Sequence, residues 1–586
     1  MNNLFGAWDT ETANRAGGGH AVLVCSRDRD DVLGEIVLPV DCEAILSLLV
    51  GLGPRSWAWN LDFDVSAICH PNLGFGVSCL SELHGIGHTR WRDYELRYIP
   101  HKVFAVKYKD GPWAETFDLL GFYNCSLRSA AEKHLPSDAQ KQEIPRAWYS
   151  EMGACLKDHR ARRVISYCHV DVSATQALGA RMVASFTAIN LPMKRPISPA
   201  NLAGKYFGSR VRVEGRIASS DDEYFRGGYH GGRIEVGSLG SFGPTWEYDI
   251  SSAYPYEMSR LKSLRGAETI PIRAGGTLPP CDYAMVDVDL AVPDTEYWGP
   301  VVVPGQHRSV YPVGRFRARI GLPAWEEMSR LGWVSHVFGG LAVRCVEGAD
   351  LLFPDMVDLY TRRADSCVGD AIKLLMNSAY GKLAERTRLL CEDITGRPFG
   401  ETRLRGREVS GGMTSFVLAS HITESVRMRV WAVARAAGSG CLMIATDGLY
   451  TTHTIPLAGI GFGGWRESHY DSSVILGCGR YILYRGAVPE KIRLRGYPGA
   501  DLGMVRQLSL SKGTWCDLTG RGRVGPKPWL VGGGVSDFNV LDFSSPHRFE
   551  LGDQARTWPM PPAAIRDCFK RQYESKPIIA EVSNGG

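Results

Sequence analysis

Two apolar segments that lie far apart in the chain each carry an aspartate where a predicted strand ends. In WEYDI, Asp249 closes an apolar strand, and in CLMIATDGLY, Asp447 lies at the turn of a hairpin with apolar residues on both sides. Such an aspartate alone is usually a turn or cap residue. On neighbouring strand ends the two would form a carboxylate pair, which requires a fold that brings these distant segments together.

The composition is that of a large globular protein. Its 586 residues exceed what one hydrophobic core supports, so we expect several packed units. Hydrophobic residues make up 44% and charged residues 22%, so extensive disorder is not expected. The net charge of +4 is too small to indicate a nucleic-acid binder by itself, although local grooves matter more than the sum.

The sequence shows no export or membrane signal. The first residues, MNNLFGAWDTET, lack the basic run and apolar stretch of a signal peptide. No apolar run approaches the roughly 18 residues of a transmembrane helix. The 15 cysteines form no CxxC pair, so we expect reduced core thiols rather than zinc sites. These features predict a cytoplasmic protein without a membrane partner.

Hydrophobic periodicity divides the chain into segments. Residues 1–190 alternate strand and helix patterns, typical of an α/β unit, and the prolines of NLPMKRPISP then mark a boundary. A β-rich segment with many prolines and glycines covers 261–349. Helices are predicted over 369–385 and 414–437, and the second leads into the hairpin that carries Asp447. The last 60 residues or so show no clear pattern.

One face of the helix over 369–385 is polar. Lys373, Asn377 and Tyr380 have the spacing i, i+4, i+7 and therefore share that face. Such a face is often simply solvated, but lysine also binds phosphate and tyrosine stacks on a base or sugar. Phosphoryl transfer to a DNA 3′-end uses two divalent ions about 4 Å apart, which carboxylates hold. Asp249 and Asp447 suit that purpose.

Three segments, DISSAYP, KLLMNSAYGK and ATDG, resemble motifs A, B and C of family B DNA polymerases in the same order. The helix ASHITESVR resembles that family's helix before motif C, with Thr423 and Arg427 as its DNA contacts. The resemblance implies a multidomain fold of the α/β and α+β classes. An RNase H-like 3′–5′ exonuclease domain would precede a right-hand polymerase of palm, fingers and thumb with two insertions. One departure is Ala445, where motif C usually has the first aspartate of DTD.

The resemblance also implies roles in the polymerase site. Asp249 and Asp447 would ligate two Mg²⁺ ions, for which Mn²⁺ can substitute, and the Ile250 carbonyl would complete one metal shell. Tyr254 would pack under the deoxyribose and exclude a 2′-hydroxyl, so the substrate would be a dNTP. The residues that would hold the nucleotide are Ile250, Tyr254, Arg362 or its neighbour Arg363, Lys373, Asn377 and Tyr380.

A second acidic set lies near the N-terminus. AWDTET places Asp9 and Glu11 on one face of a strand, WNLDFDV adds Asp64, and SYCHVD adds Tyr167 and Asp171 one helical turn apart. These elements resemble the DEDDy-type proofreading exonuclease that precedes family B palms. The resemblance implies that the four acids carry two Mg²⁺ ions and that Tyr167 positions the water. Implied contacts with the frayed single strand are Thr12, Asn60, Ser126 and Leu127, with Lys141 as a further phosphate contact.

The length of the chain resembles the protein-primed branch of the family, from linear-genome phages and linear plasmids. Tyr229, Gly231 and Gly232, in YHGGR, resemble that branch's DNA-binding YxGG element. Arg480 and Tyr481 stand where a KxY-like primer contact is expected, and VGPKPWLVGGGVSDFNVLDF resembles the start of the thumb.

The resemblance implies a domain order. It gives an exonuclease domain at 1–190, palm at 191–260 and 414–525, fingers at 350–383, thumb at 526–586, and insertions at 261–349 and 384–413. The first insertion would contact a terminal priming protein, and the second would support strand displacement and processivity. Expected partners are primer-template DNA, dNTPs and the terminal protein, and we expect a monomer in the cytoplasm of a host cell.

The leading hypothesis is a replicative polymerase of a viral or plasmid genome, with proofreading and protein priming. One alternative is a polymerase that starts without a protein primer. A second is a DNA-binding protein whose polymerase site has lapsed, which Ala445 motivates, and a third is a nuclease without polymerase activity.

Overall fold

The computed structural model describes the chain except for several segments. The residues described are 5–12, 20–37, 40–140, 143–305, 309–391, 405–457, 459–495, 500–513, 515–523, 540–548, 551 and 555–580. Lys141 and most of the segment that resembles the start of the thumb lie outside them. In the described part of the chain every helix is too short or too polar to cross a membrane. Cysteines with described side chains are free and mostly buried, as the sequence predicts.

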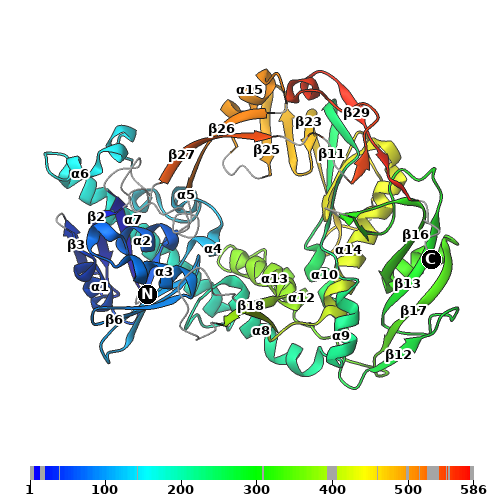
Figure 1. Cartoon of the computed structure of the whole chain (residues 1–586), viewed down its shortest axis with the longest axis horizontal. Helices are drawn as coiled ribbons and strands as arrows, with labels where there is room; N and C mark the ends of the chain where they lie inside the picture. Colours follow the sequence, from blue (N-terminus) through cyan, green and yellow to red (C-terminus); the bar gives the residue numbers. More distant parts are fainter. Residues whose placement is uncertain are drawn as a thin grey trace.

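The elements are arranged in a ring (Figure 1). The N-terminal domain lies on one side of the ring, and the strands within residues 268–344 lie on the other (Figure 1). The hairpin of β26 (Trp515–Arg523) and β27 (Val540–Arg548) reaches back toward the N-terminal domain.

An eight-stranded sheet forms the N-terminal domain, in the order β3-β2-β1-β4-β8-β7-β6-β5. Pairing is parallel between β1 and β4 and between β4 and β8, and antiparallel elsewhere. The strands are β1 (Gly6–Thr12), β2 (Ala21–Arg27), β3 (Leu33–Val37), β4 (Arg55–Ala58), β5 (His88–Trp91), β6 (Tyr94–Ile99), β7 (Val103–Tyr108) and β8 (Trp113–Asp118).

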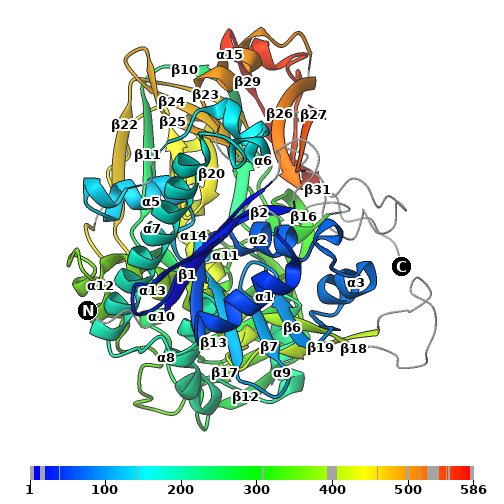
Figure 2. The same cartoon turned by 90° about the vertical axis from the view of Figure 1, so that its left-hand side faces the viewer.

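Alternation along β1 explains how helices cover both faces of this sheet. Ala7 belongs to the core under the long helix α7 (Ala161–Ala188), whereas Trp8 belongs to the core under α2 (Leu61–Ile68). Neighbouring residues of a strand point to opposite faces, so both faces are apolar. Figure 2 views the molecule from the side of this domain.

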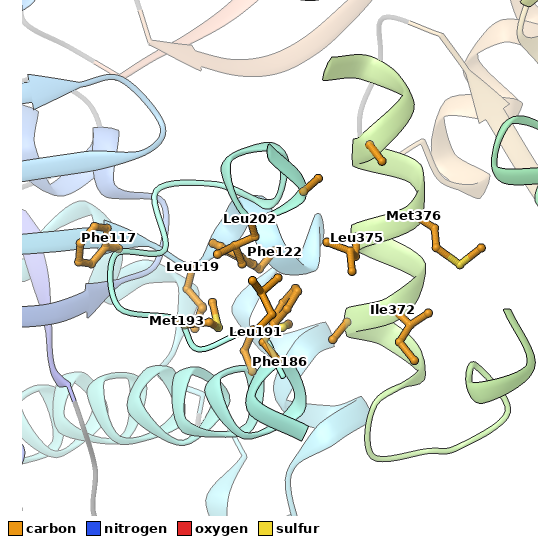
Figure 3. Packing of buried hydrophobic residues seen from close by; sticks show 14 of the residues in the cluster. Phe117, Leu119, Phe122, Phe186, Leu191, Met193, Leu202, Ile372, Leu375 and Met376 are labelled. Carbon is orange, nitrogen blue, oxygen red and sulfur yellow. The ribbon is translucent and has the colours of Figure 1, made fainter. Parts of the chain in front are cut away.

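The helix α13 (Gly369–Leu383) joins the N-terminal domain to the rest of the chain. It packs along α8 (Pro199–Glu214), and the shared core runs on to α7 and β8. In Figure 3, Leu375 points from α13 toward Leu202 and Phe122. Burial of such side chains contributes roughly 1.5–3 kcal/mol each, so this junction is a core rather than a loose contact.

Two five-stranded antiparallel sheets follow. The first, which we call the central sheet, has the order β22-β11-β21-β20-β9, and the second, the outer sheet, has the order β25-β24-β23-β10-β29. The central strands are β9 (Arg233–Val236), β11 (Thr245–Ile250), β20 (Cys441–Thr446), β21 (Gly448–Thr451) and β22 (Trp465–Tyr470). The outer strands are β10 (Ser238–Phe242), β23 (Ser472–Gly477), β24 (Arg480–Arg485), β25 (Val488–Leu494) and β29 (Gln572–Glu574).

Helices cover the central sheet. The long helix α14 (Phe416–Ala437) lies against β20 and β21 and contacts α9 (Ser219–Arg226), α10 (Ala253–Ser259) and α11 (Leu322–Arg330). Its predicted position in the sequence is confirmed. Because helices surround it, side chains all around α14 are buried, including polar ones.

The segment 261–349 forms a sheet of its own, as its β-rich pattern predicts. The order is β12-β17-β13-β16-β31, with β12 (Glu268–Ile272), β13 (Tyr283–Val292), β16 (Val313–Gly321), β17 (Val334–Arg344) and β31 (Ile579–Ala580). The C-terminal strand β31 thus returns to this sheet. Nearby, Arg233, Glu235 and Arg556 form a fully buried charge network that ties the C-terminal segment to β9.

Candidate active sites

The central sheet brings Asp249 and Asp447 together. Asp249 pairs with Gly448 across β11 and β21, and the Ile250 amide donates a hydrogen bond to the Asp447 carbonyl at 3.0 Å. Asp447 therefore lies at a hairpin turn directly beside the end of β11. The two aspartates are therefore adjacent, as predicted, although about 200 residues separate them in the sequence.

Burial and mutual repulsion set the charge state of this pair. Burial raises the pKa of Asp447 to about 6, and the nearby negative charge of Asp249 adds to the effect. Burial also raises the pKa of Asp249, while Arg466 opposes this with a hydrogen bond of 2.7 Å between Nη2 and Oδ2. Two crowded carboxylates offer hard oxygen donors, the ligands that Mg²⁺ prefers. The donor set therefore fits divalent cations.

Aromatic side chains from three segments meet beside the pair. The rings of Tyr254 and Tyr380 stack with centroids 4.5 Å apart, and the hydroxyls of Tyr380 and Tyr229 are 3.0 Å apart. Gly232 lies close to the same cluster. A Cβ atom there would stand 2.7 Å from the Tyr254 hydroxyl and 2.5 Å from Cγ2 of Thr446, the residue before Asp447. The predicted nucleotide contacts Tyr254 and Tyr380 thus adjoin the carboxylate hairpin.

Cationic and polar candidates lie on the neighbouring helices. Lys373 and Asn377 are exposed on α13, on the face that the sequence predicts. Of the two arginines that the sequence leaves open, Arg363 donates a hydrogen bond to Ser252 in the turn after Asp249. Arg362 instead donates to the carbonyl at the end of α7, at 3.2 Å. The geometry therefore favours Arg363 over Arg362 as the residue facing this site.

The two predicted DNA contacts on α14 are buried. Thr423 is fully buried, and its hydroxyl donates to carbonyls of its own helix. The Arg427 guanidinium donates to the carbonyls of His230 and Gly231, at 2.6 and 3.0 Å. Arg427 thus holds the loop of Tyr229 to Gly232 in place from behind. The structure places both residues where they support the site rather than on its surface.

The candidate primer contacts start β24 in the outer sheet. Arg480 is half-buried, and Tyr481 is buried, with its hydroxyl hydrogen-bonded to that of Tyr450 at 2.8 Å. Tyr450 lies on β21, so this bond links the outer sheet to the hairpin of Asp447.

In the N-terminal domain, β1 places Asp9 and Glu11 on the face that α7 covers. Their carboxylates and the Cys168 sulfur lie within 4.8 Å of one another, close enough to share a metal ion. Asp64 approaches β1 from α2, and its Oδ1 accepts a hydrogen bond of 2.7 Å from Thr10, the residue between the two acids. Oxygen donors dominate this group, which fits a divalent cation such as Mg²⁺.

Tyr167 and Asp171 both lie on α7, and the group of atoms within 4.8 Å includes neither Asp171 nor Asp64. Burial raises the pKa of Tyr167, and the negative charges of Asp171 and Glu11 raise it further, so the hydroxyl lies near both acids and stays protonated. Tyr149 donates a hydrogen bond of 3.1 Å to the Tyr167 oxygen. A protonated phenol in this position can donate a hydrogen bond to a water molecule.

The remaining candidates of this domain differ in exposure. Asn60 is exposed and has a φ of 64°, which asparagine tolerates. Its backbone N–H donates a hydrogen bond to the buried Asp118 carboxylate at 3.0 Å. Thr12 ends β1 half-buried. Ser126 is exposed and caps the helix α5 (Leu127–His134), whereas Leu127 is buried in the core.

Three residues at these sites were not among the predicted candidates. Arg466 contacts Asp249 only because β22 pairs with β11 in a register that places them opposite each other. Asp118 follows an apolar strand, the pattern used to select Asp249, and this pattern could have identified it. Cys168 is a buried cysteine in a helix, and nothing local distinguishes it from a core residue.

The sequence matches no protein-family model and no curated protein. Solved structures of phi29 DNA polymerase are similar in fold at 14% sequence identity. Its orthorhombic crystal form gives a TM-score of 0.67, covering 93% of this chain and 100% of that chain. Its complex with single-stranded DNA gives 0.64 with the same coverage. Its ternary complex with primer-template DNA and incoming nucleotides gives 0.62, covering 89% and 97%.

This similarity shows the fold. The chain has the mixed α/β multidomain architecture of the phi29 enzyme, in which an exonuclease domain precedes palm, fingers and thumb. The fold class expected from the sequence is thereby confirmed.

Proposed function

We propose that this chain is a family B DNA polymerase that adds dNTPs to a DNA 3′-end, with a proofreading 3′–5′ exonuclease in its N-terminal domain. The observation that carries the proposal is the position of Asp249 and Asp447. Both lie at the same end of the adjacent strands β11 and β21, where the Ile250 amide donates a hydrogen bond to the Asp447 carbonyl, and the stacked Tyr254 and Tyr380 lie beside them. The phi29 enzyme of the same fold was solved with primer-template DNA and incoming nucleotides.

Each residue group has a proposed task in extension. Two Mg²⁺ ions would activate the 3′-hydroxyl and hold the triphosphate. Asp249, Asp447 and the Ile250 carbonyl would hold these ions. Lys373 and Arg363 balance the charge of the triphosphate, and Tyr380 faces the base pair. Arg427 holds the loop that contains Gly232 in place. Because Gly232 has no Cβ atom, Tyr254 has room to lie under the sugar.

The acids of β1 have a different task. Asp9, Glu11, Asp64 and Asp171 would hold the ions that assist hydrolysis of a mispaired 3′-end. Tyr167 would orient the attacking water through its protonated hydroxyl.

We further propose that the enzyme replicates a viral or plasmid genome and starts on a terminal protein. The segment 261–349 supports this, because its sheet is separate from the two sheets that carry the carboxylate sites and offers a further surface for a priming protein. Incubation with the purified terminal protein and a labelled dNTP tests it. A polymerase that starts without a protein primer would give no covalent protein–nucleotide adduct.

Primer extension on a primed single strand tests the main proposal. With Mg²⁺ or Mn²⁺ and all four dNTPs, the primer is expected to grow to the template end, and omission of one dNTP should stop it at the matching base. A second template that carries an annealed downstream strand measures strand displacement. Absence of template-directed extension under both metals would favour the lapsed-site alternative.

Tyr254→Val is expected to admit ribonucleotides. The smaller side chain no longer fills the space under the sugar, so discrimination against rNTPs should fall by about 100-fold, a size typical of a steric pocket contact. The ratio of kcat/KM for dCTP and CTP measures this. Sugar discrimination equal to that of the parent protein would refute the steric role of Tyr254.

Gly232→Ala is expected to lower kcat/KM for dNTP incorporation by about 10- to 100-fold, the range that overpacking of a tight contact produces. The new methyl group would clash with Thr446 and the Tyr254 hydroxyl. Gly231→Ala is the matched control, because no atom lies within 4 Å of a Cβ there, and it should lose much less. Equal losses in both variants would show that the loop, not this contact, matters.

A further inference from the structure

A small polar cavity lies beside Asp249, between the central and outer sheets. Its volume is about 210 Å³, and its lining includes Glu247, Asp249, Ala445, Tyr481, Lys491 and Arg493. The cavity therefore holds two acids and two cations next to one proposed metal ligand. None of the functions assigned above uses Glu247 or Lys491.

Glu247 is held firmly in this cavity. It lies two residues before Asp249 on β11, so both side chains point to the same face. Its carboxylate accepts hydrogen bonds from Lys491 Nζ at 2.5 Å, the Tyr450 hydroxyl at 2.8 Å and the Tyr470 hydroxyl at 3.0 Å. The side chain is 16% exposed. These partners come from β25, β21 and β22, so one carboxylate connects the two sheets.

Ala445 lies on the same face of the central sheet. It pairs with Gly448, and Gly448 pairs with Asp249, so the three residues form one row across the strands β20, β21 and β11. Directly opposed residues of antiparallel strands share a face. The Ala445 methyl therefore lines the cavity from one side, while the Glu247 carboxylate reaches it from the other. On this face the strand β11 carries a carboxylate, that of Glu247, whereas the hairpin carries the Ala445 methyl.

We propose that Glu247 is a positioning residue of the polymerase site and supplies, from β11, the carboxylate that the ATDG hairpin lacks at Ala445. It keeps the Lys491 ammonium away from Asp249 and anchors the outer sheet through Tyr450 and Lys491. This inference rests on the proposed polymerase function. Without the Glu247 charge, Lys491 is free to turn toward Asp249 in the same cavity and compete with cations for its carboxylate.

Glu247→Gln tests the inference in the full chain. The amide keeps the shape but removes the charge, so we expect single-nucleotide incorporation to fall about 10- to 100-fold, the size of a lost set of charged hydrogen bonds. Glu490→Gln is the matched control. Glu490 lies on the same strand as Lys491 and forms an exposed ion pair with Arg485. Its rate should equal that of the parent protein.

Two further measurements distinguish positioning from mere support of the fold. The rate of single-strand degradation should be unchanged in Glu247→Gln, although the loss of this largely buried charge should lower the melting temperature. In a protein with Asp9→Ala and Glu11→Ala, calorimetry with Mn²⁺ alone should show weaker binding at the remaining site when Glu247→Gln is added. Parallel loss of stability, degradation and extension would overturn the proposal, as would unchanged extension.

Placing a carboxylate at position 445, with and without that of Glu247, provides the decisive comparison. Ala445→Asp alone should slow extension, because a further acid crowds Asp249 and Asp447. Combined with Glu247→Gln, the same change should restore at least part of the lost rate, giving a favourable coupling in the double-mutant cycle. Additive losses of extension rate in the double variant would refute the idea that Glu247 replaces a carboxylate at position 445. If the parent protein itself fails to extend a primer, the proposed function is wrong rather than this inference.

Discussion

Asp249→Asn is expected to lower primer extension by at least about 10³-fold, because loss of one metal-binding carboxylate removes several kcal/mol of transition-state stabilisation. Asparagine keeps the size of the side chain and can still accept a hydrogen bond from Arg466, but it carries no charge. The measurement is the rate of single-nucleotide incorporation into a labelled primer at saturating Mg²⁺ and dNTP.

Asp289→Asn is the control for this change. Asp289 also lies on a strand and forms an ion pair with an arginine, Arg317, but it belongs to the separate sheet of 261–349. Its variant should extend the primer at the parent rate. If Asp249→Asn extends equally fast, the Asp249–Asp447 pair is not the polymerase site.

The fold should tolerate the loss of the Asp249 charge. Burial raises the pKa of both Asp249 and Asp447, so ionisation of these groups costs stability in the folded state. A carboxyl whose pKa is higher in the folded protein than in the unfolded chain contributes stability at pH values below its unfolded pKa. That contribution is lost as the pH rises through the folded pKa, which is about 6 for Asp447. In metal-free buffer at pH 8, Asp249→Asn should therefore melt no lower than the parent protein.

The central carboxylate pair was predictable because its signals are local. Each acid follows an apolar strand, and DISSAYP and ATDG keep their order along the chain. The strand β1, the helix α13 and the helix α14 were predictable for the same reason, since their periodicity lies in adjacent residues. The assembly of β11 with β20 and β21 follows from the fold once these local elements are recognised.

Contacts that depend on register or on distant loops were not predictable. Thr423 and Arg427 are polar residues in a helix, and a sequence pattern assigns such residues to a surface. The structure buries them because α14 is enclosed and because the partners of Arg427 are two loop carbonyls nearly 200 residues earlier. No side-chain pattern marks a backbone carbonyl as a partner.

The C-terminal segment shows the same limit. Its strands β29 and β31 have only three and two residues, too few to show a period of two. They exist because they add to the edges of sheets formed by β10 and β16, far earlier in the chain. Arg556 is likewise buried among distant partners, which include Glu235 and the Tyr297 carbonyl.

The double variant Asp9→Ala/Glu11→Ala is expected to lower degradation of a labelled single strand by at least about 10³-fold while leaving extension unchanged. Both acids belong to the group that can hold a metal in the N-terminal domain. They lie in a different sheet from Asp249, and changes at distant sites with no shared partner act independently. A primer with a mismatched 3′-end should then persist instead of being trimmed before extension.

Two exposed acids of the same domain serve as the control. Asp30 lies in a turn and Glu43 pairs with Arg92 at the surface, so Asp30→Ala/Glu43→Ala removes the same charge without touching β1. This variant should degrade and extend at parent rates. A nuclease without polymerase activity predicts that Asp9→Ala/Glu11→Ala abolishes every activity, whereas two separate sites predict loss of degradation alone. Loss of both reactions in a protein that still melts at the parent temperature would show that one metal site serves both.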